Sequence, residues 1–190
     1  MKKSVKILSV ISVFVILLCC SCSGGNTSSD NLFDFTFEIN GKQYTLPEKL
    51  DKFTENGFAF PEDFKTDKDI APGSLEATYM TLGDEDNWIN VEIFNYGEEK
   101  KALTDCPVGR VIYHFDGELE ISTAGGFSLG GKKLDDVISK YGKPFSQADY
   151  STYTEVIYDK DPTSGIYDRY TFRFNKDTKI IEYVDITMFY

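Results

Sequence analysis

The sequence predicts an α+β fold, with helical segments packed on one face of an antiparallel sheet in two tandem repeat units. Apolar and polar residues alternate along several segments, and this period of two is typical of strands that are buried on one side. Two other segments space their apolar residues at three and four positions, as amphipathic helices do. These two segments resemble each other, which favours a duplicated unit.

The first expected strand covers residues 32–39, where apolar residues occupy alternate positions from Phe33 to Ile39. Asn40-Gly41 follows it and is a strong signal for a tight turn between antiparallel strands. Tyr44 would begin the return strand. The sequence therefore opens with a predicted β-hairpin.

A helix of about ten residues is expected next, because Leu46, Leu50 and Phe53 are spaced by four and three positions. Pro47 suits the first turn of such a helix, and Gly57 supplies a left-handed cap at its end.

A second helix is expected within residues 129–142, where Leu134, Val137, Ile138 and Tyr141 form a compact apolar stripe. Alternating apolar residues predict strands before and after it. These strands are expected at residues 75–82, 88–95, 109–115, 152–158, 167–174 and 179–189.

The two helical segments share a local pattern. Tyr44-Thr45-Leu46 precedes Lys49-Leu50-Asp51, and Phe127-Ser128-Leu129 precedes Lys133-Leu134-Asp135. The separation of about 84 residues predicts repeat units at 32–116 and 117–190 within a single body, 32–190. Chance similarity between two short amphipathic helices is the alternative.

The N-terminus has the composition of a signal peptide. Three lysines lie within the first six residues, and residues 7–20 are almost wholly apolar. This run is short for a transmembrane helix, which needs roughly 20 apolar residues. A buried helix or a short membrane anchor is the alternative.

Ser21-Cys22 ends this segment, which resembles a bacterial lipoprotein signal. In that family the cysteine thiol receives a diacylglyceryl group and the peptide is cleaved just before the cysteine. The resemblance implies a signal peptide at 1–21, lipidation of Cys22 and attachment to the outer face of a bacterial cell membrane. Cys19 stands where the family prefers leucine, so Cys20 and Cys19 are alternatives to Cys22. Residues 22–31 are rich in Gly, Ser and Asn and predict a flexible tether.

The chain is acidic, with 31 acidic and 20 basic residues and a formal net charge of −11. Removal of residues 1–21 takes away three lysines and no acidic residue, which leaves a formal net charge of −14. This charge argues against a nucleic-acid partner and favours a basic one. It also repels an anionic membrane surface, so the lipid must hold the protein there.

The sequence shows no signature of an enzyme. His114 is the one histidine, and Cys106 is the one cysteine that follows Cys22. The acidic runs 84–87 and 159–165 match solvated turns better than a calcium loop. We therefore expect no catalytic residues, metal or cofactor. The alternative is a hydrolase that uses carboxylates alone on an envelope glycan.

Residues 129–144, which end in Tyr141-Gly142-Lys143-Pro144, resemble a motif of small secreted lipoproteins. The motif is found in domains similar to the β-lactamase inhibitor protein and to the small outer-membrane lipoprotein of the β-barrel assembly machinery. Residues 37–47 also resemble the opening of uncharacterised lipoproteins from Gram-positive bacteria. The inhibitor protein and the assembly lipoprotein work by binding proteins, so the resemblance implies a binding role here. None of their contact residues can be matched to this chain.

The last strands indicate where such binding would occur. If one face of the sheet is covered by helices, alternation places five residues on the other, open face. These residues are Thr171, Arg173, Tyr183, Asp185 and Thr187. They mix aromatic, charged and hydroxyl groups, as binding faces do. The sequence thus predicts a lipid-anchored protein that binds a protein or another envelope component.

Overall fold

The computed structural model of the chain describes residues 31–189. The expected signal peptide, the lipidation site Cys22 and the tether through residue 30 lie outside the described residues.

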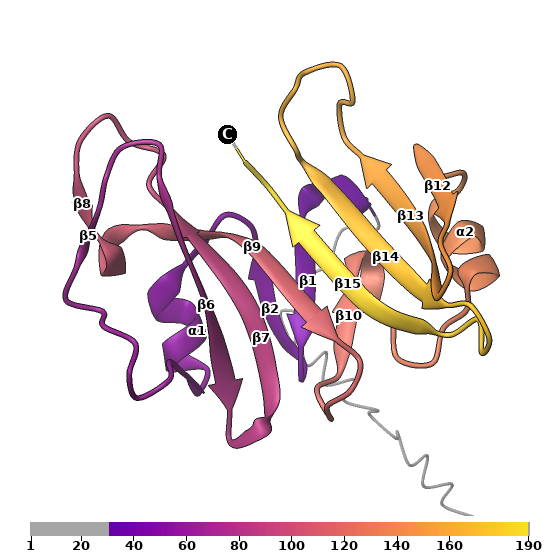
Figure 1. Ribbon diagram of the computed structural model, residues 1–190, viewed down its shortest axis with the longest axis horizontal. Helices are drawn as coiled ribbons and strands as arrows, with labels where there is room; N and C mark the ends of the chain where they lie inside the picture. The colour runs from indigo at the N-terminus through magenta and orange to yellow at the C-terminus, as the bar shows by residue number, and fades with distance from the viewer. Residues whose placement is uncertain (1–30, 190) are drawn as a thin grey trace, which may run out of the picture.

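A large antiparallel sheet of nine strands spans the described part of the chain (Figure 1). Eight strands follow the order β12-β13-β14-β15-β9-β7-β6-β4, and β3 pairs with β9. Their bounds are β3 Glu48–Lys49, β4 Phe58–Ala59, β6 Leu75–Leu82, β7 Asp84–Phe94, β9 Pro107–His114, β12 Ser146–Asp149, β13 Tyr153–Asp159, β14 Arg169–Asn175 and β15 Ile181–Thr187.

A second, smaller antiparallel sheet has the order β11-β10-β1-β2. Its strands are β1 Thr36–Ile39, β2 Lys42–Thr45, β10 Ile121–Thr123 and β11 Phe127–Ser128. The short strands β5 (Asp69–Ile70) and β8 (Lys101–Ala102) pair with each other. The described helices are α1 (Leu50–Glu55), α2 (Leu134–Tyr141) and single 3-10 turns at Leu32–Asp34, Leu103–Asp105 and Ala124–Gly126.

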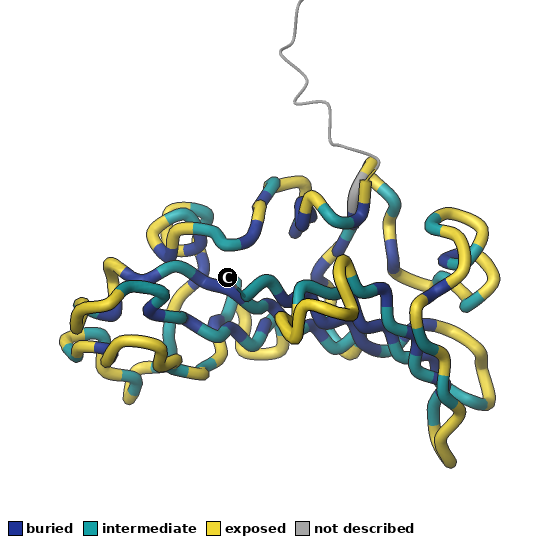
Figure 2. Tube along the Cα trace, turned by 90° about the horizontal axis from the view of Figure 1, so that it is seen from above, coloured by how far each residue is buried: buried dark blue, intermediate teal, exposed yellow. Residues whose placement is uncertain are grey.

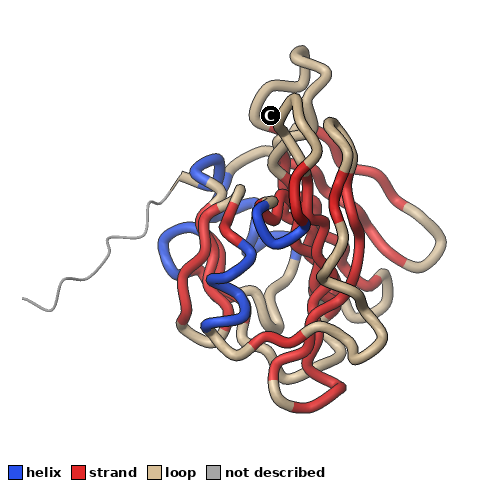
Figure 3. Tube along the Cα trace, turned by 90° about the vertical axis from the view of Figure 1, so that its left-hand side faces the viewer, coloured by secondary structure: helices blue, strands red, loops and turns tan. Residues whose placement is uncertain are grey.

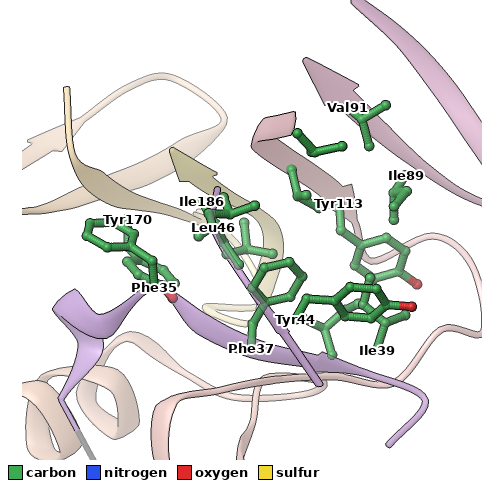
Figure 4. Close-up of a cluster of buried hydrophobic side chains, with 14 of the residues drawn as sticks. Phe35, Phe37, Ile39, Tyr44, Leu46, Ile89, Val91, Tyr113, Tyr170 and Ile186 are labelled. Atoms are coloured by element: carbon green, nitrogen blue, oxygen red, sulfur yellow. The ribbon is translucent and has the colours of Figure 1, made fainter. Parts of the chain in front are cut away.

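The core lies between the two sheets, which form the two layers seen edge-on in Figure 3. Figure 4 shows Phe35, Phe37 and Ile39 of the N-terminal segment directed toward side chains of the large sheet. The ring of Phe35 stacks on that of Tyr170 in β14, with their centroids 5.6 Å apart. Residues of both layers are buried in one continuous cluster (Figure 2).

The two α-helices lie on the same side of the large sheet as the small sheet, near its two ends (Figure 1). Phe53 of α1 stacks on Tyr44 of β2, with 4.5 Å between ring centroids. Tyr141 of α2 meets Tyr158 of β13 edge-on at 6.1 Å. The opposite face of the large sheet is therefore left without a covering layer among the described residues.

The α+β prediction is wrong, because the described residues form a β-rich fold. α1 has only six residues and α2 only eight. The expected first helix is shortened because Glu48 and Lys49 pair with β9 instead of forming its first turn. The centre of the large sheet is covered by a second sheet, so helices do not form the second layer.

The two tandem repeat units predicted with that fold are not separate bodies in the structure. β1, from the first expected unit, pairs with β10, from the second, with Ile39 opposite Ile121. β9 of the first unit likewise pairs with β15 of the second. The strands of residues 32–116 and 117–190 are thus interleaved across both sheets, and their core is shared.

The predicted hairpin at the start of the body agrees with the structure in its turn but not in its full length. Asn40 and Gly41 both have positive φ, of 48° and 72°, and join β1 to β2. A two-residue turn of this kind matches the twist of the flanking strands. Residues 32–34, however, form a 3-10 turn, so the strand begins only at Thr36.

Tyr170→Phe is expected to raise the free energy of unfolding by about 1 kcal/mol. The hydroxyl of Tyr170 is buried and has no hydrogen-bond partner within residues 31–189, so its removal relieves an unsatisfied polar group. Tyr158→Phe is the matched control and should lower stability, because the Tyr158 hydroxyl donates to the Gly142 carbonyl at 2.8 Å. Urea unfolding at neutral pH measures both, and a loss of stability in Tyr170→Phe would contradict the expectation.

Candidate functional site

One side chain from each of five neighbouring strands forms a row across the open face of the large sheet. From β13 to β7 these residues are Tyr153, Arg173, Tyr183, His114 and Trp88. The Arg173 guanidinium carbon lies 4.8 Å from the Tyr153 ring centroid and 4.4 Å from that of Tyr183. The His114 ring lies 5.0 Å from Tyr183 and 5.6 Å from Trp88. We call this row the aromatic ladder.

Strand register explains why these side chains share a face. Tyr183 stands opposite His114 in the β15–β9 pair and opposite Arg173 in the β14–β15 pair. The neighbouring residues Phe172 and Val184 point the other way, into the core. Because successive side chains of a strand alternate between faces, the apolar core pattern directs the ladder outward.

Arg173 is held in the ladder by two kinds of contact. Its Nε donates to Glu155 Oε2 at 2.8 Å, and its guanidinium lies between the rings of Tyr153 and Tyr183. Arginine stacked in this way keeps a fixed orientation and retains other N–H donors for a partner. The ladder therefore presents a preorganised aromatic surface around a guanidinium whose charge is paired with Glu155.

A partly buried network of ion pairs adjoins the ladder. Arg110 Nη1 lies 2.6 Å from Glu92 Oε1, and Arg110 Nη2 lies 2.7 Å from Asp185 Oδ2. Asp185 also accepts hydrogen bonds from the hydroxyls of Thr187, at 2.7 Å, and Tyr183, at 3.4 Å. Hydrogen bonding to Asp185 raises the pKa of Arg110, so this guanidinium stays charged. The charges of these three side chains are thus paired with one another.

The five predicted binding residues all lie on this face, but they differ in accessibility. Arg173 is partly exposed, whereas Tyr183 is 8% exposed. Thr171, Asp185 and Thr187 are buried, with 5%, 3% and 2% exposed. Strand alternation placed these residues on the correct face, but their burial by neighbouring side chains depends on cross-strand register.

The sequence-based prediction missed Trp88, His114 and Tyr153 as members of the ladder. The signal for Trp88 was present, since Ile89 and Val91 beside it alternate toward the core and leave Trp88 on the opposite face. The proximity of Trp88 to His114 results from the pairing of β7 with β9, in which Asn90 stands opposite Ile112. Local alternation does not reveal such pairing.

A groove of about 820 Å³ begins where the ladder ends at Trp88. It lies between the chain after β4 and the outer side of β6 and β7. Its lining residues are Phe60, Pro61, Glu62, Asp63, Tyr79, Thr81, Glu85, Trp88 and Asn90. We call it the aromatic groove, because three of its lining side chains are aromatic.

Cys106 has the environment of a structural cysteine. Its thiol is buried and donates to the Ala102 carbonyl at 3.4 Å. Burial raises the pKa of the Cys106 thiol, which disfavours the nucleophilic thiolate. Among residues 31–189, no group of three or more His, Cys, Asp or Glu side chains is arranged to hold a metal ion.

Comparisons with protein-family models, with curated proteins and with solved structures found no match to this chain. Within the described residues, no helix has the length and apolar character that a membrane span requires.

The stability of the protein is expected to fall as the pH rises from about 10 to about 12. Burial raises the pKa of Tyr158 and of Tyr183 from 10.0 to about 12. The unfolded chain therefore loses these protons first, and the free energy of unfolding decreases by about 1.4 kcal/mol per pH unit for each tyrosine. Urea unfolding between pH 9 and 12 measures the slope. The double variant Tyr158→Phe/Tyr183→Phe should make the slope less steep, and an unchanged slope would refute the assignment; buried Tyr170, whose pKa is also raised, keeps part of the slope.

Proposed function

We propose that this chain is a lipid-anchored protein of the bacterial cell envelope that binds a protein or another envelope component without catalysing a reaction. The membrane attachment is through a lipid on Cys22, and the binding surface is the open face of the large sheet. The aromatic ladder on that face is the observation that supports the binding role most directly.

The ladder has the composition of protein-binding surfaces. Tyrosine, tryptophan and arginine are the residues that dominate binding energy at interfaces. Here such residues come from four strands, and His114 of a fifth strand contacts both Tyr183 and Trp88, so the side-chain conformations are restricted before a partner arrives. A preorganised surface loses less conformational entropy on binding. The formal net charge of −14 after removal of residues 1–21 favours a basic partner.

Hydrolysis of an envelope glycan has no comparable support. A carboxylate that acts as a general acid needs a raised pKa. Asp149 and Asp161 instead have lowered pKa values, because hydrogen bonds from Thr154 and Thr163 favour their charged forms. We therefore base the proposal on binding.

Binding through the ladder is tested by capture of envelope proteins on the full chain in detergent. The ladder variant Arg173→Ala/His114→Ala should recover fewer specific proteins than the unchanged chain. The control Lys49→Ala removes one formal positive charge, as the ladder variant does with His114 neutral, and should recover the same proteins as the unchanged chain. Equal recovery by the ladder variant and the unchanged chain would overturn the proposed binding surface, provided thermal unfolding shows that the variant is folded.

The membrane anchor is tested by mass spectrometry of the N-terminal peptide from cells that express the full chain. A diacylglyceryl group on Cys22 is the expected result. A chain that keeps Met1 and carries no lipid would overturn this part of the proposal.

A further inference from the structure

The aromatic groove at the end of the ladder has a lining suited to a cationic ligand. Three aromatic side chains, Phe60, Tyr79 and Trp88, line it together with three carboxylates. These carboxylates belong to Glu62, Asp63 and Glu85, all of them exposed. No lysine, arginine or histidine is among the lining residues. Aromatic faces attract cations through the ring quadrupole, and the carboxylates add direct charge complementarity.

A lysine beside the groove is already held in this way. The ring of Phe60 stacks on that of Phe64 at 4.8 Å, and Lys68 Nζ lies 4.4 Å from the Phe64 centroid. The same ammonium lies 2.7 Å from Glu76 Oε1. An aromatic ring and a carboxylate thus hold one lysine beside the groove, and the groove itself offers the same two groups to a lysine or arginine from outside.

The strand beside the groove has an open edge. β6 pairs with β7 along its length, but on its other side it pairs with β4 only at Thr81 and Leu82. Among the described strands, residues 75–80 therefore have no second partner (Figure 1). Such an edge accepts an additional strand from another chain. Tyr79, which is 45% exposed, lies both on this strand and in the groove.

We infer that the aromatic groove binds an extended segment of a partner protein that carries lysine or arginine. The segment pairs with the open edge of β6 and places a cationic side chain between Tyr79, Trp88 and the carboxylates. This inference rests on the proposed binding function and assigns a ligand class to one part of the open face.

Trp88 provides a direct signal for this test, because it is the one tryptophan of the chain. The full chain in neutral detergent is titrated with hexalysine, with hexaglutamate and with the hexamer of N-acetylglucosamine. Hexalysine alone is expected to give a saturable change in tryptophan fluorescence. Hexalysine with a methylated backbone should bind more weakly, because it lacks the N–H donors that strand addition requires.

The carboxylates are tested with two variants of equal net charge. The groove variant is Glu62→Gln/Asp63→Asn/Glu85→Gln. The control variant, Glu55→Gln/Asp135→Asn/Asp177→Asn, changes three exposed carboxylates on α1, on α2 and after β14. We expect the groove variant to weaken hexalysine binding about tenfold or more and the control variant to change it less than about threefold.

Three results would overturn the inference: no response to hexalysine, a response only to the glycan, or equal weakening by the groove and control variants. The last result would show that bulk charge alone attracts the peptide. If hexalysine fails while ladder-dependent capture of envelope proteins persists, this inference fails and the proposed function stands. If hexalysine binds but capture does not depend on the ladder, the proposed binding surface fails and the groove assignment stands.

Discussion

Replacement of Arg110 by methionine is expected to lower the free energy of unfolding by about 3–5 kcal/mol. Methionine keeps much of the apolar stem but removes the guanidinium that contacts both Asp185 and Glu92. Asp185 is 3% exposed, so its charge would be left in the sheet with only hydroxyl donors. An unpaired buried carboxylate carries a large desolvation cost, which is the physical reason for the size of the effect. Urea unfolding at pH 7 measures the change.

Two further variants check that explanation. Asp185→Asn added to Arg110→Met should restore part of the lost stability, because it removes the unpaired charge. Lys100→Met breaks an ion pair with Asp69 in which both partners are exposed, so it should cost less than about 1 kcal/mol. Equal losses in Arg110→Met and Lys100→Met would contradict the role assigned to burial.

Phe35→Ala is expected to have an effect of similar size, about 3–5 kcal/mol, for a different reason. The Phe35 ring is fully buried and stacks on Tyr170 of the large sheet, so it joins the two layers. Its removal leaves a cavity between the two layers, and the cost grows with the volume that does not collapse. The positive φ of 51° is unfavourable for phenylalanine and alanine alike, so the change reports mainly on the lost ring.

The matched control for the Phe35 variant is Phe145→Ala, whose side chain is 61% exposed. It should change the free energy of unfolding by less than about 0.5 kcal/mol. Phe35→Leu fills part of the cavity, so its loss of stability should lie between those of Phe35→Ala and Phe145→Ala. If Phe35→Ala were as mild as Phe145→Ala, contact between the two layers would contribute little to stability.

Side-chain alternation was sufficient to predict which faces of the last strands are buried. Phe172 and Val184 lie in the core, whereas Arg173 lies on the opposite face, as a period of two requires. The turn at Asn40-Gly41 was likewise predictable, because few residues other than Asn and Gly adopt positive φ easily. These features depend on residues close together in the sequence.

The arrangement of the layers was not predictable in the same way, because it depends on which strands pair. The alternating residues 36–39 were compatible with membership in any antiparallel sheet, and their partner β10 is distant in sequence. The burial of Asp185 depends on Arg110, which reaches it only because Thr187 stands opposite Arg110 in the β15–β9 pair. The aromatic groove brings together the chain after β4 and two later strands, so no local pattern revealed it.

The interleaving of the strands constrains the order in which the chain folds during its synthesis. The Glu120 N–H donates to the side chain of Asn40, 80 residues earlier in the sequence. The small sheet therefore cannot form until β10 has been synthesised and can pair with β1. β15 lies between β14 and β9, so the large sheet closes only after residues 181–187 have emerged. Long-range pairing of this kind slows folding and leaves strand edges exposed in the meantime. A chain that lacks residues 181–187 should therefore be cut by protease more readily than the whole chain, because β9 and β14 lack the strand that joins them.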